Sequence, residues 1–251
     1  RALIRETVDA LDGGVASQET QTSLLDAIMD VDDCDRLVLS NENFICVVPR
    51  IFDGVTFYPQ ITEKIVSYSN LFQGHDLEFQ MGIINPASFI PLVCERNKDK
   101  AGYEEYLSGS DPRALRWSAV VARITEACPS ARVTVWSNED SPLIWRDILH
   151  SLAGLNGRTE LDGDDDFLAE IMSAEGMQRF HAYMRTHPPR NEAQYGRVVA
   201  AFLDKFAVEG ELENEIDLPG WNDALVDQLT ATYEQDLLAF QAMNDVTFLK
   251  P

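Results

Sequence analysis

The chain has 251 residues, 45% of them hydrophobic, and its 42 acidic and 20 basic residues give a formal net charge of −22. This length and composition are enough for one sizeable core and exclude a disordered or fibrous protein. The negative charge repels phosphate groups, so we expect neither nucleic acid nor an anionic membrane surface as a partner.

The acidic surface and the cysteines bear on where the protein works. Such a surface suits solubility in a salt-tolerant or crowded cytoplasm, and it also suits docking onto a basic surface of a partner protein. The four cysteines form no CxxC pair, which favours a reducing compartment without disulfides or a metal site. Apolar runs stop well short of the roughly 20 residues of a membrane helix. We therefore expect a soluble, cytoplasmic protein without membrane insertion.

The chain begins with a predicted helix. Residues 1–14 read RALIRETVDALDGG, which is typical of a helix that ends at a Gly-Gly stop. The first residue is Arg1 and the segment has none of the features of a signal peptide. We expect the chain to be the remainder of a longer protein.

Short β-rich runs then alternate with longer helical patterns. Residues 36–40, RLVLS, predict a strand, and Ile61, Ile65 and Tyr68 lie at helical spacing before Gly74. The further elements are strands at 76–84 and 131–136, and helices that start at Pro86, at 110–129 and at 141–155. This alternation predicts an α/β fold of three layers, with a mainly parallel sheet flanked by helices.

The pattern changes at an acidic stretch. Residues 160–166, ELDGDDD, show no apolar period and lack the ligand spacing of a calcium loop, so we predict a solvated acidic linker. Everything beyond it predicts helix, in three segments at about 165–186, 191–207 and 220–243. We therefore divide the chain into an α/β core at 1–159 and an all-helical C-terminal lobe at 160–251 that packs on the core.

Polar residues that follow the predicted strands are the candidates for a site, because ligands bind at the carboxyl ends of parallel strands. Glu42 could act as a base or as a turn anchor, and Ser88 could contact an anion or satisfy backbone donors of a first helical turn. Glu139 and Asp140 precede Ser141-Pro142, where helix capping is favoured over chemistry. The four histidines show no catalytic or metal-binding spacing, so we interpret them as structural or surface residues.

Several of these segments resemble sulfotransferases in the same order along the chain. IINPASFIPLVC is similar to the strand that ends in Arg-(Asp/Asn)-Pro before a helix with a Ser. RVTVWSNEDSPLIWRDILHSLAGL is similar to the later strand, Glu-Asp turn, helix and Gly. LVLSNENF resembles a strand followed by Ser-x-Glu, and LTATYEQDLLAF resembles the closing helix with its Tyr. The resemblance covers residues 36–155 and the last helix.

The resemblance implies a P-loop-like α/β fold and the donor 3′-phosphoadenosine 5′-phosphosulfate (PAPS). It also implies a first strand and a phosphate-binding loop upstream of Arg1. Asn85 aligns with the acid or amide before the Pro, which places Ile84 at the position of the Arg and Leu92 at that of the Ser. Neither side chain can donate a hydrogen bond, and each lost bond to a charged group costs roughly 1.5–3 kcal/mol. Asn85 and Ser88 remain as the residues of a degenerate donor site, and Glu42 as the candidate base.

The sequence therefore predicts a degenerate sulfotransferase-like protein. We expect it to be catalytically inactive, to need no cofactor, and to bind a basic surface of another protein as an accessory subunit of a larger assembly. The alternative is an active PAPS-dependent enzyme that transfers a sulfuryl group to a hydroxyl acceptor, with Glu42 as base. A third possibility is some other acidic α/β binding module.

Overall fold

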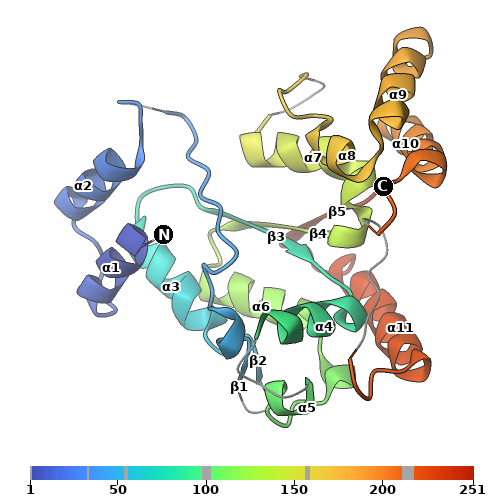
Figure 1. Cartoon of the computed structure of the whole chain (residues 1–251). Coiled ribbons are helices and arrows are strands. Elements are labelled where there is room, and N and C mark those ends of the chain that lie inside the picture. The colour runs from blue at the N-terminus through green and yellow to red at the C-terminus, as the bar shows by residue number, and fades with distance from the viewer. Residues whose placement is uncertain (1, 33, 54–55, 98–102, 156–158, 211–217) are drawn as a thin grey trace.

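The computed structural model describes residues 2–32, 34–53, 56–97, 103–155, 159–210 and 218–251 (Figure 1). The α-helices are α1 (Ala2–Leu11), α2 (Gln18–Ile28), α3 (Ile61–Leu71), α4 (Pro86–Arg96), α5 (Tyr103–Tyr106), α6 (Trp117–Ala127), α7 (Ser141–Ala153), α8 (Asp166–Ile171), α9 (Ala174–Thr186), α10 (Glu192–Phe206) and α11 (Asp223–Phe240). The strands are β1 (Phe52–Asp53), β2 (Thr56–Phe57), β3 (Glu78–Ile83), β4 (Arg132–Ser137) and β5 (Val246–Leu249). Short 3₁₀ turns cover Val48–Arg50, Pro112–Ala114 and Asn138–Asp140.

The main sheet is small and wholly parallel, in the order β3-β4-β5. Glu78 pairs with Arg132 at the start of β3, and Val133 pairs with Val246 of β5. The predicted α/β class is confirmed, with a parallel sheet of three strands among many helices. The prediction of an all-helical lobe at 160–251 is wrong, because this range contains strand β5. Its four residues are too few to show a period against the long helix before them.

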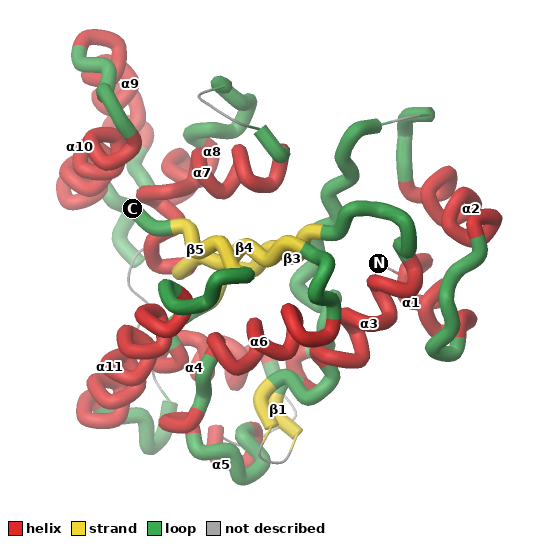
Figure 2. Tube along the Cα trace, turned by 180° about the vertical axis from the view of Figure 1, so that it is seen from behind, coloured by secondary structure: helices red, strands yellow, loops and turns green. Residues whose placement is uncertain are grey.

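Helices cover the sheet on both faces. In Figures 1 and 2, helices α7, α8, α9 and α10 lie on one face, and α3, α4, α6 and α11 lie on the other. Successive side chains of β4 point to opposite faces of the sheet, because a strand has a period of two residues. Val133 and Val135 point into the main core, whereas Trp136 lies against Gly82 of β3, where an added Cβ would be 3.0 Å from the indole nitrogen.

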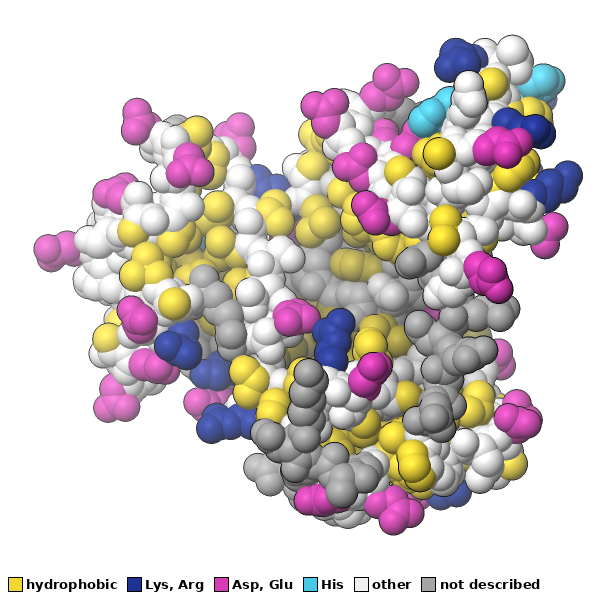
Figure 3. All heavy atoms as spheres, in the orientation of Figure 1, with side chains coloured by type: hydrophobic (Ala, Val, Ile, Leu, Met, Phe, Trp, Pro, Cys, Tyr) yellow, Lys and Arg dark blue, Asp and Glu magenta, His cyan; other side chains and the backbone are white. Residues whose placement is uncertain are grey.

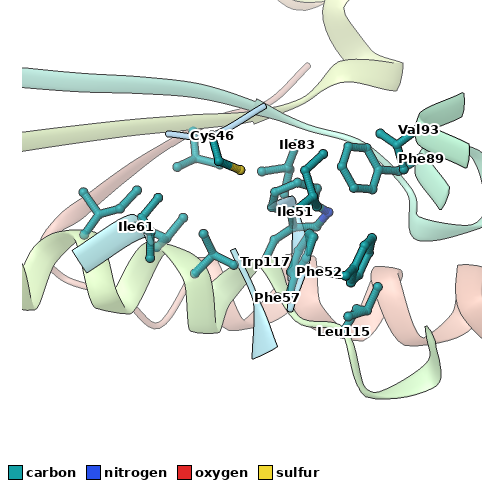
Figure 4. Packing of buried hydrophobic residues seen from close by; sticks show 14 of the residues in the cluster. Cys46, Ile51, Phe52, Phe57, Ile61, Ile83, Phe89, Val93, Leu115 and Trp117 are labelled. Atoms are coloured by element: carbon teal, nitrogen blue, oxygen red, sulfur yellow. The ribbon is translucent and has the colours of Figure 1, made fainter. Parts of the chain in front are cut away.

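The main core joins the sheet to α3, α4, α6 and α11 (Figure 4). Trp117 is at its centre, with its ring centroid 4.8 Å from that of Phe57 and 5.3 Å from that of Phe89. Trp117 is only 3% exposed, so its indole ring packs inside this core. Tyr233 and Phe240 of α11 belong to the same cluster. Helix α11 and strand β5 therefore complete this core from the C-terminal part of the chain.

A second core lies on the other face, between α8, α9, α10 and the start of α7. The acidic stretch is attached to it, which corrects the prediction of a solvated linker. Arg146 of α7 forms a 3.0 Å ion pair with Asp165, and its guanidinium lies 4.2 Å from the centre of the Tyr195 ring. Trp145 donates its indole N–H to the carbonyl of Gly163 at 2.9 Å. An arginine and an aromatic ring on α7 thus hold the acidic residues in place.

The predicted strand at 36–40 is wrong, because this segment runs as an irregular loop. Leu37, Val38 and Leu39 are exposed to between 37% and 50%, so the segment does not lie inside the sheet. Arg36 instead anchors it by a two-bond ion pair with Glu78, at 2.6 and 2.9 Å. Arg132 also pairs with Glu78. A carboxylate at the start of β3 therefore holds both the preceding loop and the neighbouring strand.

Replacement of Glu78 should change the acid sensitivity of the fold. Hydrogen bonds from Arg36, and then from Arg132, lower the pKa of Glu78 to about 2. A lowered pKa stabilises the folded state above the ordinary value of 4.5, and this stabilisation is lost as the pH falls towards 2. We expect Glu78→Gln to lower the free energy of unfolding by about 1–3 kcal/mol at neutral pH.

The deficit of Glu78→Gln should shrink as the pH falls through this window, as measured by urea unfolding at a series of pH values. Glu126→Gln is the control, since this exposed glutamate lies on α6 and is part of no ion pair among the described residues. A deficit that stays constant from neutral pH to pH 3 would contradict the assigned role of the carboxylate.

Candidate functional site

The candidate site lies where β3 and β4 end side by side. Because the two strands are parallel, the residues that follow Ile83 and Ser137 meet at one edge of the sheet. Helix α4 begins directly after β3, and a 3₁₀ turn leads from β4 into α7. Helix α11 passes beside this edge and contributes Thr230, Tyr233 and Asp236.

Asn85 is the N-cap of α4, as its position before Pro86 predicts. Its side-chain oxygen accepts a hydrogen bond from the backbone N–H of Ala87 at 2.9 Å, which satisfies a donor of the first helical turn. Its side-chain amide donates to Thr230 of α11 at 2.9 Å. Asn85 therefore uses both ends of its amide to hold the start of α4 against α11.

The carboxylate of Glu139 occupies the corner in front of α4. It accepts the backbone N–H of Asn85 at 2.6 Å and the hydroxyl of Ser137 at 2.7 Å. The hydroxyl of Tyr233 lies 3.1 Å from the same carboxylate and 3.1 Å from the hydroxyl oxygen of Ser137. Glu139 is exposed to solvent, whereas Ser137 and Tyr233 are buried. The protein thus supplies its own anion at this helix N-terminus.

The electrostatics of the corner keep the hydrogen-bond donors in place. Burial raises the pKa of Tyr233, and the nearby carboxylates of Glu139 and Asp140 raise it further, so the phenol keeps its proton and remains a donor. Burial and the charge of Glu139 also raise the pKa of Asp140. A further anion brought to this place would meet carboxylates on the rim, which repel it.

A second buried carboxylate caps the neighbouring helix α6. Asp236 of α11 is 4% exposed and accepts the backbone N–H groups of Trp117 at 2.6 Å and of Ser118 at 3.2 Å. The hydroxyl of Ser118 donates to the other oxygen of Asp236. The indole of Trp117 in turn donates to the carbonyl of Ile84 at 2.8 Å. Two helices at this edge therefore begin on carboxylates of the chain itself.

The structure separates the predicted site residues. Asn85 lies in the corner, and the backbone N–H of Ser88 donates to the carbonyl of Asn85 at 2.9 Å, as in an ordinary first turn. Glu42 lies on an exposed loop and forms a 3.1 Å ion pair with Arg96, with 72% of its side chain exposed. Since Arg96 is at the other end of α4, about 16 Å of helix separate it from the corner. The structure does not place Glu42 with Asn85 and Ser88.

Two residues of the cluster were missed as site residues in the sequence analysis. Tyr233 entered the sequence analysis only as the Tyr of the closing helix in the family resemblance, and Asp236 was not considered. Asp236 lies on the buried, apolar face of that helix, between Leu229 and Phe240, where an acid is not expected unless it has a partner. An acidic residue within an apolar helical stripe was therefore the available signal.

The corner does not fit a polyanionic donor such as PAPS. The side chains of Ile84 and Leu92 carry no hydrogen-bond donor, and the backbone N–H of Asn85 is engaged by Glu139.

Within the described parts of the chain, no three His, Cys, Asp or Glu residues are grouped so that they could hold a metal ion. The same parts contain no helix that is both long and apolar enough to cross a lipid bilayer.

Comparison with known proteins adds no family to this picture. No protein-family model, no curated protein and no solved structure gives a significant match to the chain. The resemblance to sulfotransferases therefore rests on the quoted segments alone, and it stays a prediction.

Replacement of Asp236 tests whether the cap matters. We expect Asp236→Asn to lower the free energy of unfolding by about 2 kcal/mol, because an amide cannot accept all three hydrogen bonds as a carboxylate does. Urea unfolding followed by circular dichroism measures the change. Asp227→Asn on the exposed face of the same helix is the control, with an expected change within about 0.5 kcal/mol. Equal stabilities of the two variants would contradict the role of Asp236.

Proposed function

We propose that this chain is a catalytically inactive α/β protein, sulfotransferase-like in descent, that binds another protein as an accessory subunit of a larger assembly. The observation that carries the proposal is the carboxylate of Glu139, which takes the backbone N–H of Asn85 and the hydroxyl of Ser137. An anionic substrate such as PAPS would need these N–H and hydroxyl groups at the start of α4. A site whose hydrogen-bond donors already bind an internal carboxylate is suited to stability rather than to turnover.

The charge of the surface supports a protein partner of the opposite sign. The chain carries 22 more acidic than basic residues, and Figure 3 shows Asp and Glu side chains distributed widely over the visible face. Such a surface attracts a basic partner and speeds encounter with it, while it repels nucleic acid and anionic lipid. We therefore propose a basic surface on another protein as the binding partner.

Titration calorimetry with PAPS and with adenosine 3′,5′-bisphosphate tests the proposed loss of activity. We expect no heat of binding up to millimolar ligand, because Ile84 and Leu92 offer no hydrogen bond and Glu139 repels the phosphates. Glu139→Ala removes the internal anion, and we expect this variant to stay silent as well. Micromolar binding by the wild type would support the active transferase instead. Binding by the variant alone would show a blocked donor site and would contradict the loss of the donor-binding groups.

Salt dependence tests the proposed kind of partner. We expect the immobilised protein to retain a partner from native lysate at low salt and to release it near 1 M salt, where the Debye length falls to about 3 Å. The partner should then be purified and remixed, and its dissociation constant should rise steeply with salt. Retention of no protein at low salt, or an affinity that does not change with salt, would contradict a partner held by charge.

A further inference from the structure

A surface groove runs between α9 and α10, which project together from one end of the molecule (Figure 1). Its volume is about 760 Å³, within the range of about 300–1,000 Å³ that ligand sites occupy. Helix α10 lines it from Gln194 to Phe206, a length of about 18 Å. The groove is thus about three helical turns long, which is longer than any single side chain.

Aromatic side chains give the groove an apolar wall. Tyr183 of α9 is 40% exposed, and Phe202 and Phe206 of α10 are only partly buried, with their rings stacked at 5.9 Å between centroids. Phe202 also packs edge to face on Phe180 of the second core, at 5.4 Å. These rings pack on the second core on one side and are exposed to solvent on the other, which is typical of a surface that binds an apolar side chain of a partner.

Three cations stand along the same groove. Arg179 is positioned by an ion pair with Glu175 at 2.7 Å and lies 5.5 Å from the centre of the Phe206 ring. Arg197 and Lys205 are exposed, and the ion pairs found in the described parts of the chain include neither of them. No Asp or Glu is among the described residues that line the groove. Two positive charges here thus remain available to an outside partner.

The local charge is opposite to that of the whole chain. Residues 174–206 contain five Arg and Lys against three Asp and Glu, a balance of +2 in a chain of −22. Figure 3 shows Lys and Arg side chains over α9 and α10, beside yellow apolar groups and with some Asp and Glu side chains among them. A positive, aromatic groove on an acidic protein favours an acidic ligand with apolar groups, and the rest of the surface would repel such a ligand.

We propose that this groove binds an amphipathic helix of a partner protein, with Asp and Glu on its polar side and Leu or Phe on its apolar side. The groove is about three turns long, so it fits a helix laid along α10. Apolar side chains on successive turns of that helix would pack between Phe202 and Tyr183. Arg197 and Lys205 pair with its acids. This proposal goes beyond the proposed function, since it assigns a second site of opposite sign that does not depend on the corner at Asn85.

Fluorescence anisotropy with a model peptide tests the groove on the full chain. The probe is a labelled, capped peptide of about 18 residues with Leu and Phe at i, i+3, i+4 and i+7 and Glu at the outer positions. We expect micromolar binding, with a loss of at least about tenfold in the double variant Arg197→Glu and Lys205→Glu, equivalent to about 1.4 kcal/mol. Arg185→Glu is the control, because it makes the same charge change per site on α9 but does not line the groove. It should keep wild-type affinity within about twofold.

Ala201→Arg separates shape from charge, because Ala201 lines the groove and is exposed. The variant adds positive charge but fills the groove, so we expect it to lose binding although general attraction to acids would increase. Circular dichroism melts confirm that each variant is folded. The proposal is overturned if a scrambled peptide of equal composition binds as well, or if Ala201→Arg binds like the wild type. A wild-type dimer in sedimentation that Ala201→Arg abolishes would overturn it in favour of a second copy of the chain.

Discussion

The structure depends on the satisfaction of helix N-termini by internal carboxylates. Glu139 accepts the backbone N–H at the start of α4, and Asp236 accepts two at the start of α6. In each case the acid comes from a different part of the chain, so the bond also fixes one element against another. Free N–H groups at a helix start attract anions. In this chain, carboxylates of Glu139 and Asp236 accept these N–H groups in the folded state. At the edge where many α/β proteins bind a ligand, these carboxylates hold neighbouring elements together.

The main core and the second core support different parts of the molecule. The main core carries the sheet and the capped helices, and its polar connections are buried around Tyr233 and Asp236. The second core supports α9 and α10, whose outer surfaces stay exposed and positively charged. A rigid base with a projecting helical pair is a common arrangement for recognition, because the pair can present side chains without disturbance of the fold. The proposed basic groove lies on the helices that the second core supports, whereas acidic side chains are spread over the visible face of the molecule (Figure 3).

Local patterns predicted much of the fold. The strand and helix on either side of Asn85-Pro86 and the helix that ends at Gly154 appear as expected, because alternation, capping and a left-handed stop are local signals. The run at 36–40 was mistaken for a strand, since its apolar residues are exposed and only Arg36 ties it to the sheet. Asn85 was predicted as a site residue. Its link to Thr230, across 145 positions, depends on tertiary packing that no local pattern contains.

The late position of β5 along the chain has a kinetic consequence. Its Val246 pairs with Val133 of β4, a separation of 113 residues, and α7 to α11 lie between them. Closure of so long a loop costs entropy before any pairing rewards it, and topologies rich in such contacts fold slowly. Until β5 arrives, β4 presents an open edge to solvent, where it can pair with the wrong strand. Completion of the sheet therefore depends on the most C-terminal strand, whereas the hydrogen bonds of the helices are local.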